Sequence, residues 1–104
     1  MTHKAITESA RNQKCTVRLP GICNYNPDTT IFAHISGLRH GHGVGQKTIF
    51  GAYCCSSCHD CVDFRARSAL TKDYLRAAHL DGAIETLCII LRDTPELWAK
   101  FLKD

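Results

Sequence analysis

Apolar residues recur at steps of three and four along the C-terminal third of the chain. The spacing begins near Leu70 and predicts one long helix over about 72–92, because residues three and four apart share a helix face. The repeating apolar residues are Leu80, Ile84, Leu87, Cys88 and Leu91. We expect this face to pack on the core of the domain, with Cys88 as a small buried apolar side chain.

A second helix is predicted to follow, after Thr94 and Pro95. Threonine is a good helix N-cap and proline fits the first helical position, so this pair marks a boundary between two helices. The closing helix would place four apolar residues against the core: Leu97, Trp98, Phe101 and Leu102.

The rest of the chain alternates short apolar runs with turn-forming residues. The pattern favours a short helix over 7–13, β-strands over 29–35 and 47–53, and another helix over 57–69. Residues 36–46 contain four glycines and therefore indicate a loop. Strands and helices in this mixed order predict one small α+β domain that spans residues 1–104.

Residues 54–61 hold four cysteines, a histidine and an aspartate in eight consecutive positions. Cys55 and Cys58 have the Cys-x2-Cys spacing, which lets two thiolates reach one Zn²⁺ ion from a tight turn. A closed zinc site needs four ligands, so a second pair is required. Cys15 and Cys23 flank a Pro-Gly turn that would fold into a β-hairpin and bring their thiols together. We therefore expect a structural Zn²⁺ site made by Cys15, Cys23, Cys55 and Cys58.

The sequence leaves other assignments of the cysteines open. Cys58 and Cys61 repeat the same spacing, so the ligand register is ambiguous. The seven residues between Cys15 and Cys23 exceed the usual spacing of about two to four. His59 could supply the fourth ligand in place of a cysteine. Disulfides are a further alternative, but the odd number of cysteines and the absence of an apolar signal segment favour a reducing cytoplasm.

Length and charge narrow the classes of function. A chain of 104 residues buries a modest apolar surface, so a metal ion that joins distant segments would add useful stability. The formal net charge of +3 is mildly basic, which is compatible with nucleic acid but not diagnostic of it. No apolar run is long enough to span a membrane. We therefore expect a cytoplasmic protein without membrane contact.

Three motifs in this order resemble one known family. They are Cys15-Thr16-Val17-Arg18-Leu19-Pro20-Gly21-Ile22-Cys23, Ala33-His34-Ile35 and Cys55-Ser56-Ser57-Cys58-His59-Asp60. With the order strand, glycine-rich loop, strand, cysteine turn and helix, they look like the small phage- and prophage-encoded HNH (ββα-metal) endonucleases. The resemblance implies a zinc-stapled ββα-metal core with a β-hairpin knuckle and C-terminal helices.

The resemblance also implies a metal-dependent DNA endonuclease. His34 would be the general base that takes a proton from water, and His59 would bind the catalytic Mg²⁺ or Mn²⁺ ion. The Zn²⁺ ion would then be structural, holding the strands and the helix in place. A recombination partner or a second copy of the chain could assist the reaction.

Two departures from the family pattern concern the catalytic ion. Many HNH nucleases carry an aspartate where this chain has Ala33, and an asparagine near the second strand that is absent here. The chain offers as replacement ligands His40, His42, Asp60 and Asp63. The alternative interpretation of the two loop histidines is that they are solvated, and that of Asp63 is an ion pair with Arg67.

Three cations are expected to border a bound DNA strand: Lys47 after the glycine-rich loop, and Arg65 and Arg67 on the helix that begins near His59. The alternative function is a catalytically inactive, zinc-stabilised DNA- or protein-binding module, which the two departures favour. A redox or metal-storage role would leave the hairpin and the histidines unexplained.

Overall fold

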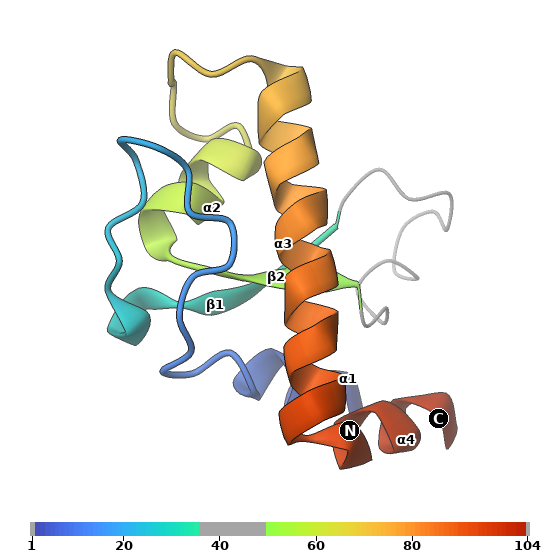
Figure 1. Cartoon of the computed structure of the whole chain (residues 1–104). Helices are drawn as coiled ribbons and strands as arrows, with labels where there is room; N and C mark the ends of the chain where they lie inside the picture. The colour runs from blue at the N-terminus through green and yellow to red at the C-terminus, as the bar shows by residue number, and fades with distance from the viewer. Residues whose placement is uncertain (1, 36–49, 104) are drawn as a thin grey trace.

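The computed structural model describes residues 2–35 and 50–103 of the chain. In chain order the elements are α1 (Thr2–Glu8), the 3-10 helix η1 (Pro27–Thr29), β1 (Ile31–His34), β2 (Gly51–Cys54), α2 (Ser56–Val62), α3 (Lys72–Asp93) and α4 (Pro95–Lys103). They form a small α+β domain in which α3 crosses in front of both strands and α1 packs on α4 near one end of α3 (Figure 1). No helix in the described ranges has the length and hydropathy needed to cross a membrane.

β1 and β2 form an antiparallel pair in which His34 lies opposite Gly51. Every residue of β2 is buried. α3 comes close to this strand at Gly82, where a Cβ atom would lie 3.0 Å from Val17 Cγ2 and 3.3 Å from Ala52 Cβ. A side chain at this helix position would therefore push α3 away from the strand.

The two faces of the sheet contribute to separate apolar clusters, because successive side chains of a strand point to opposite faces. The first cluster surrounds the cysteines and includes Ala33 and Ala52. The second contains Phe32 and Tyr53, together with Ile6, Ala10 and Ile90 and the partly buried Leu97 and Trp98. The side chain of Ala33 therefore belongs to the cysteine side of the sheet.

The long helix predicted over 72–92 is confirmed as α3, but its predicted packing face is wrong. Leu80, Ile84 and Leu91 are 43%, 64% and 45% exposed, and Cys88 is exposed as well. The residues of α3 that are buried are Leu75, His79, Gly82, Ala83, Thr86 and Ile90. The apolar periodicity predicted the helix correctly but pointed to its more apolar face as the packing face. The helix packs through its other face, because only small and polar side chains there allow the close approach to β2.

The N-terminal helix lies earlier than the predicted range 7–13. α1 ends at Glu8, where the hydroxyl group of Ser9 donates a hydrogen bond to the carbonyl of Ile6. Asn12 has a positive φ of 65°, a conformation that does not continue a right-handed helix. The backbone therefore turns inside the segment that composition alone favours as helical.

The β-hairpin predicted between Cys15 and Cys23 is also wrong, because no strand forms there. Arg18 and Gly21 have φ values of 46° and 72°, which do not occur in a β-strand. The turn closes through the N–H group of Cys23, which donates to the carbonyl of Leu19 at 3.0 Å. The segment is a compact loop, which we call the knuckle (residues 15–23), and it still brings its two end cysteines together.

The remaining predicted elements are shorter in the structure. β1 occupies the second half of the predicted strand 29–35, and η1 covers its start. α2 stops at Val62 instead of continuing to residue 69, because Phe64 has a positive φ of 61° and Arg65 N–H bonds back to the carbonyl of Asp60. The predicted loop 36–46 and the first residues of the predicted strand 47–53 lie outside the described residues.

Candidate metal centre and histidine cluster

Four cysteines from two distant segments converge on one point. Cys15 and Cys23 end the knuckle, while Cys55 caps α2 and Cys58 lies in its first turn. Their four Sγ atoms all lie within 4.8 Å of one another, and those of Cys23 and Cys55 are 3.8 Å apart. A tetrahedral site with Zn–S bonds of about 2.3 Å has sulfur–sulfur edges of about 3.8 Å. Both the donor set and its spacing therefore fit a metal ion such as Zn²⁺.

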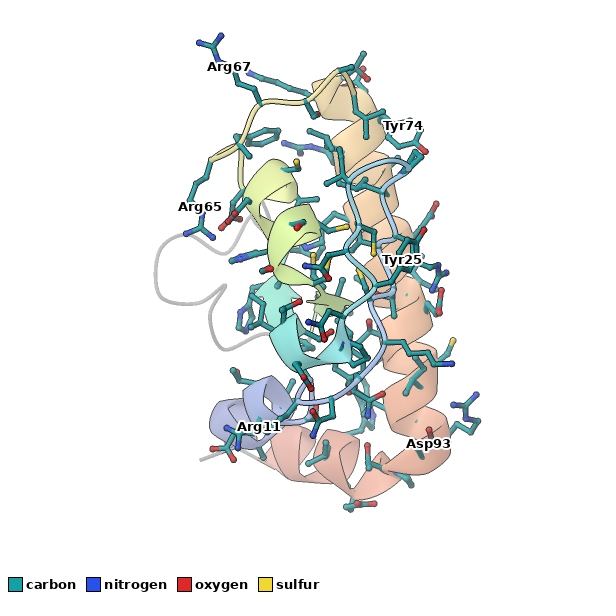
Figure 2. All side chains as sticks on the ribbon, turned by 90° about the vertical axis from the view of Figure 1, so that its left-hand side faces the viewer. Arg11, Tyr25, Arg65, Arg67, Tyr74 and Asp93 are labelled. Atoms are coloured by element: carbon teal, nitrogen blue, oxygen red, sulfur yellow. The ribbon has the colours of Figure 1, made fainter. Side chains whose placement is uncertain are left out.

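Backbone amides of the knuckle and of α2 point at the sulfur atoms. The N–H groups of Arg18, Leu19 and Cys58 donate to Sγ of Cys15, Cys58 and Cys55, each at 3.4 Å. N–H donors stabilise negative charge on sulfur, and such outer contacts orient the ligands of metal sites. The sulfur atoms in Figure 2 accordingly gather between α2, the knuckle and α3.

The thiols of this cluster change one another's ionisation. Hydrogen bonds from Cys54 and Cys58 lower the pKa of the Cys15 thiol, whereas burial raises the pKa of Cys23 to about 11. The hydrogen bond to Cys15 raises the pKa of Cys58. A cation bound at this point would favour the thiolate form of its ligands.

The other three cysteines stand outside this group. Cys54 and Cys61 are buried, at 0% and 3% exposed, and Cys88 is exposed on α3 rather than buried as predicted. Within residues 2–35 and 50–103, the four-cysteine cluster is the one group of three or more ligand side chains close enough for a shared ion. The geometry thus brings together the pair Cys55 and Cys58, and leaves Cys61 out.

His34 is the last residue of β1 and is half-buried. Its ring lies edge-to-face against Phe32, with a centroid distance of 5.0 Å and an interplanar angle of 77°. Two residues apart on a strand, both rings share one face of the sheet, while Ala33 between them faces the cysteines. An aspartate in place of Ala33 would consequently enter the apolar cluster rather than accompany the His34 ring.

His59 lies on α2 at the centre of a polar group. Its Nε2 atom is 3.1 Å from Asp63 Oδ2, one helical turn further on. The Arg65 guanidinium approaches the other ring nitrogen, with Nη2 3.0 Å from His59 Nδ1. A guanidinium only donates and a carboxylate only accepts, so a neutral ring with its proton on Nε2 satisfies both contacts.

Arg65 is surrounded by acceptors of α2 and its end. The same Nη2 atom is 3.3 Å from Asp63 Oδ2 and 3.6 Å from Asp60 Oδ1. The predicted ion pair of Asp63 with Arg67 is therefore replaced by contacts with His59 and Arg65. The Arg65 guanidinium therefore already lies at the point where the side chains of His59, Asp60 and Asp63 converge.

His79 links α3 to the backbone of β1, a contact that the sequence pattern did not predict. It lies on the buried face of α3, and its Nε2 atom is 2.9 Å from the carbonyl of Ala33, the residue before His34. Since a carbonyl accepts, Nε2 carries the proton. Burial lowers the pKa of His79, although the charge of Asp63 partly opposes this shift. A buried hydrogen bond thereby ties α3 to the end of β1.

The predicted DNA-binding cations have different surroundings. Arg67 extends away from the connection between α2 and α3, whereas Arg65 points along the side of α2 (Figure 2). Arg18 is engaged elsewhere, by an ion pair of 2.6 Å with Glu85. Lys47, His40 and His42 lie outside the described residues.

Comparison with known proteins identifies the relatives of the chain. A family model described as "Putative nuclease YbcO" matches residues 4–94. The chain belongs to the YbcO family. This YbcO-family chain is 36% identical over 90 residues to the "Putative nuclease YbcO" of Escherichia coli (strain K12), which covers 85% of this chain and 92% of that protein. The "Putative nuclease ybcO" of Enterobacteria phage 82 matches with the same identity and coverage.

A solved structure is similar over most of the YbcO-family chain. It is described as "Structure of a putative bacteriophage protein from Escherichia coli str. K-12 substr. MG1655", with a TM-score of 0.67 and 34% sequence identity. The match covers 82% of this chain and 94% of that one. The relatives are named as nucleases or as phage proteins, which agrees with the expected phage-associated nuclease family.

Proposed function

We propose that this YbcO-family chain is a metal-dependent DNA endonuclease of the HNH (ββα-metal) type. The observation that carries the proposal is one arrangement: β1, β2 and α2 follow one another beside the four-cysteine cluster, with His34 at the end of β1 and His59 paired with Asp63 on α2. The names of the relatives support a nuclease. The mildly basic net charge of +3 agrees with a nucleic-acid substrate.

In this proposal the four-cysteine cluster holds a structural Zn²⁺ ion. The ion would join the knuckle to α2 across a long stretch of chain, which removes conformational entropy from the unfolded state. The benefit is large for a domain of 104 residues with a limited core. The cysteines would then act on the reaction only through the position of α2.

The catalytic ion would be held by His59 and Asp63. A pair of side chains is enough for Mg²⁺ or Mn²⁺, because such ions usually keep several waters and take further ligands from substrate phosphates. The ion supplies charge neutralisation at the scissile phosphate and at the leaving oxygen. In the structure the Arg65 guanidinium contacts His59 Nδ1 and Asp63 Oδ2. When DNA is bound, Arg65 would contact a phosphate instead and leave these atoms to the ion.

His34 would act as the general base. A neutral imidazole can accept a proton from the attacking water at neutral pH, and the edge contact with Phe32 fixes the orientation of the ring. The hydrogen bond from His79 to the carbonyl of Ala33 holds the backbone next to this base. We therefore assign His79 a positioning role, since its only polar contact on the described chain is to backbone.

Arg65 and Arg67 would bind the phosphate backbone, together with Lys47. Both arginines are exposed and lie just beyond the end of α2, which carries His59 and Asp63. Phosphate contacts of this kind give affinity without sequence recognition. Weak sequence preference is therefore expected.

A catalytically inactive, zinc-stabilised binding module is the second candidate. The observation in its favour is that Ala33 faces the apolar cysteine cluster and Arg65 covers His59 Nδ1, so that few ligands are left for a second ion. Both candidates share the zinc centre and the cationic surface, and they differ only in cleavage.

Incubation of supercoiled plasmid with the zinc-loaded protein distinguishes the two. We expect nicking with Mg²⁺ or Mn²⁺ and none after those ions are withdrawn by a chelator too weak to remove zinc, with the zinc content measured in the same samples. DNA retention by the protein without nicking under any divalent ion would support the binding module and reject the endonuclease.

A further inference from the structure

Helix α3 packs on the domain through one face, and a second face carries exposed apolar side chains. The buried side carries Leu75, His79, Gly82, Ala83, Thr86 and Ile90. A second side carries what we call the α3 stripe, which consists of Ala77, Leu80, Ile84, Leu87 and Leu91. Leu87 lies at the edge of this stripe, half-buried against the second apolar cluster. Leu80, Ile84 and Leu91 are 43%, 64% and 45% exposed. Three of the larger aliphatic side chains of α3 are therefore exposed along one side of the helix.

Such a stripe is unusual on a small monomer. Scattered exposed apolar residues are common, but contiguous ones mark interaction surfaces. The stripe runs along about 21 Å of helix, at a rise of about 1.5 Å per residue. In Figure 1, α3 stands in front of the strands, and no described element lies in front of it. Leu80, Ile84 and Leu91, the exposed members of the stripe, are thus open to a partner.

We propose that the stripe is a dimer interface, in which α3 of a second copy of this chain packs parallel to the first. The spacing of the stripe is the seam of a two-stranded coiled coil, with Ala77, Ile84 and Leu91 at a positions and Leu80 and Leu87 at d positions. Parallel dimers favour β-branched residues at a and leucine at d, which agrees with Ile84 at the central a position and with leucine at both d positions. A second copy supplies an identical seam, because a twofold interface pairs each surface with itself.

Charged residues beside the stripe support the parallel direction. Arg76 and Asp81 occupy the g and e positions that flank the seam, and neither forms an ion pair within residues 2–35 and 50–103. In a parallel pair a g residue meets the e residue of the following heptad on the other helix. Arg76 would therefore face the partner's Asp81, and the twofold axis repeats this contact.

The proposal is independent of the nuclease assignment, because no stripe residue belongs to the buried face of α3 that carries His79. The stripe itself is apolar and uncharged, so it does not suit DNA phosphates. Arg65 and Arg67 belong to the connection between α2 and α3, so neither is part of the stripe (Figure 2). Dimerisation would leave them accessible.

Sedimentation equilibrium of the zinc-loaded full chain tests the interface. The wild-type protein should be a dimer, and Ile84→Glu should be a monomer with unchanged zinc content and circular dichroism. Phe64→Ser is the matched control, because Phe64 is 51% exposed but lies outside α3, and this variant should stay dimeric. A wild-type monomer at every concentration, or a dimer that survives Ile84→Glu, overturns the proposal.

A charge swap and a cross-link test the parallel direction. Arg76→Asp should weaken the dimer by about fivefold, and the double variant Arg76→Asp/Asp81→Arg should restore it. In a Cys88→Ser background, Leu80→Cys should form a disulfide between copies under mild oxidation, since d positions meet their own symmetry mates. Arg92→Cys should not cross-link. A dimer in which Leu80→Cys fails to cross-link and the charge swap has no effect overturns parallel packing.

Discussion

The hydroxyl oxygens of Thr16 and Thr86 lie 3.1 Å apart, over the edge of β2 that does not pair with β1. Tyr53 directs both of its backbone groups at this edge: its N–H donates to Thr86 Oγ1 at 2.9 Å, and its carbonyl accepts from the N–H of Thr16 at 2.7 Å. Thr86 Oγ1 accepts from an amide, so the Thr86 hydroxyl can donate its hydrogen to Thr16 Oγ1. The Thr16 hydroxyl then donates to the carbonyl of Tyr53 or of Gly82. Two threonines thereby join the knuckle, β2 and α3.

Thr86→Val should destabilise the protein by about 1–3 kcal/mol, because it leaves the buried N–H of Tyr53 without an acceptor at nearly unchanged volume. Thr94→Val is the matched control. Its hydroxyl makes a longer bond of 3.4 Å at a half-buried helix end, so this variant should lose less than half as much stability. Urea unfolding of the zinc-loaded variants measures both, and equal losses would contradict the role given to Thr86.

Cys58→Ser should release zinc and unfold the domain, whereas Cys61→Ser should keep both zinc and fold. The reason is geometric: Cys58 belongs to the group whose Sγ atoms lie within 4.8 Å of one another, and Cys61 does not. Cys88→Ser is the surface control and should behave as wild type. Zinc analysis after gel filtration decides the matter, and zinc loss by Cys61→Ser would mean that the ligand register is shifted.

Arg65→Gln should lower the Mg²⁺ concentration needed for cleavage while weakening DNA binding. The substitution removes the positive charge that lies 3.0 Å from His59 Nδ1 and 3.3 Å from Asp63 Oδ2, and so frees these atoms for the ion. Arg67→Gln removes a charge that has no such contact, and should weaken DNA binding alone. Nicking titrated with Mg²⁺ separates the two effects. An identical Mg²⁺ dependence in both variants would show that Arg65 does not compete with the ion.

Stability should fall in mild acid through His79. Burial depresses its folded-state pKa, so below the ordinary value of about 6.5 the unfolded chain binds a proton that the folded chain does not. The stability contributed at neutral pH is therefore lost as the pH falls from about 6.5 toward the folded-state pKa, at no more than about 1.4 kcal/mol per pH unit. His79→Gln keeps a donor for the Ala33 carbonyl and cannot titrate. Its unfolding free energy should change less between pH 7 and pH 5, with zinc loss measured in both proteins.

Local sequence patterns were sufficient for the elements whose stability is local. The step of three and four residues located α3, and the Thr-Pro boundary located α4. The cysteine spacing likewise pointed to the group that the structure brings together. In each case the signal lies in neighbouring residues, so no knowledge of distant contacts was required.

The errors concern contacts between distant segments. The packing face of α3 depends on the approach of Gly82 to β2, which hydrophobicity alone does not reveal. The knuckle is no hairpin, since the N–H groups of Arg18 and Leu19 donate to sulfur atoms of the cluster and that of Thr16 donates to Tyr53 of β2. The link through His79 arises only when α3 crosses β1, so a histidine in an apolar helix gave no indication of it.

Two histidine variants should fail to cleave DNA for different reasons, and each should be rescued by a different treatment. His34→Ala removes the proposed base, which typically costs about 10²–10⁴-fold in rate, while the residue lies outside the cysteine cluster and the His59–Asp63 pair. Added imidazole should restore part of the nicking, and extra Mg²⁺ should not. His59→Ala removes one of two ion ligands, so extra Mg²⁺ or Mn²⁺ should restore part of its activity, and imidazole should have less effect. Zinc content and DNA binding should stay at wild-type levels in both. If both variants nick plasmid at the wild-type rate, the cleavage comes from another site or a contaminant, and the binding module becomes the better description of the protein.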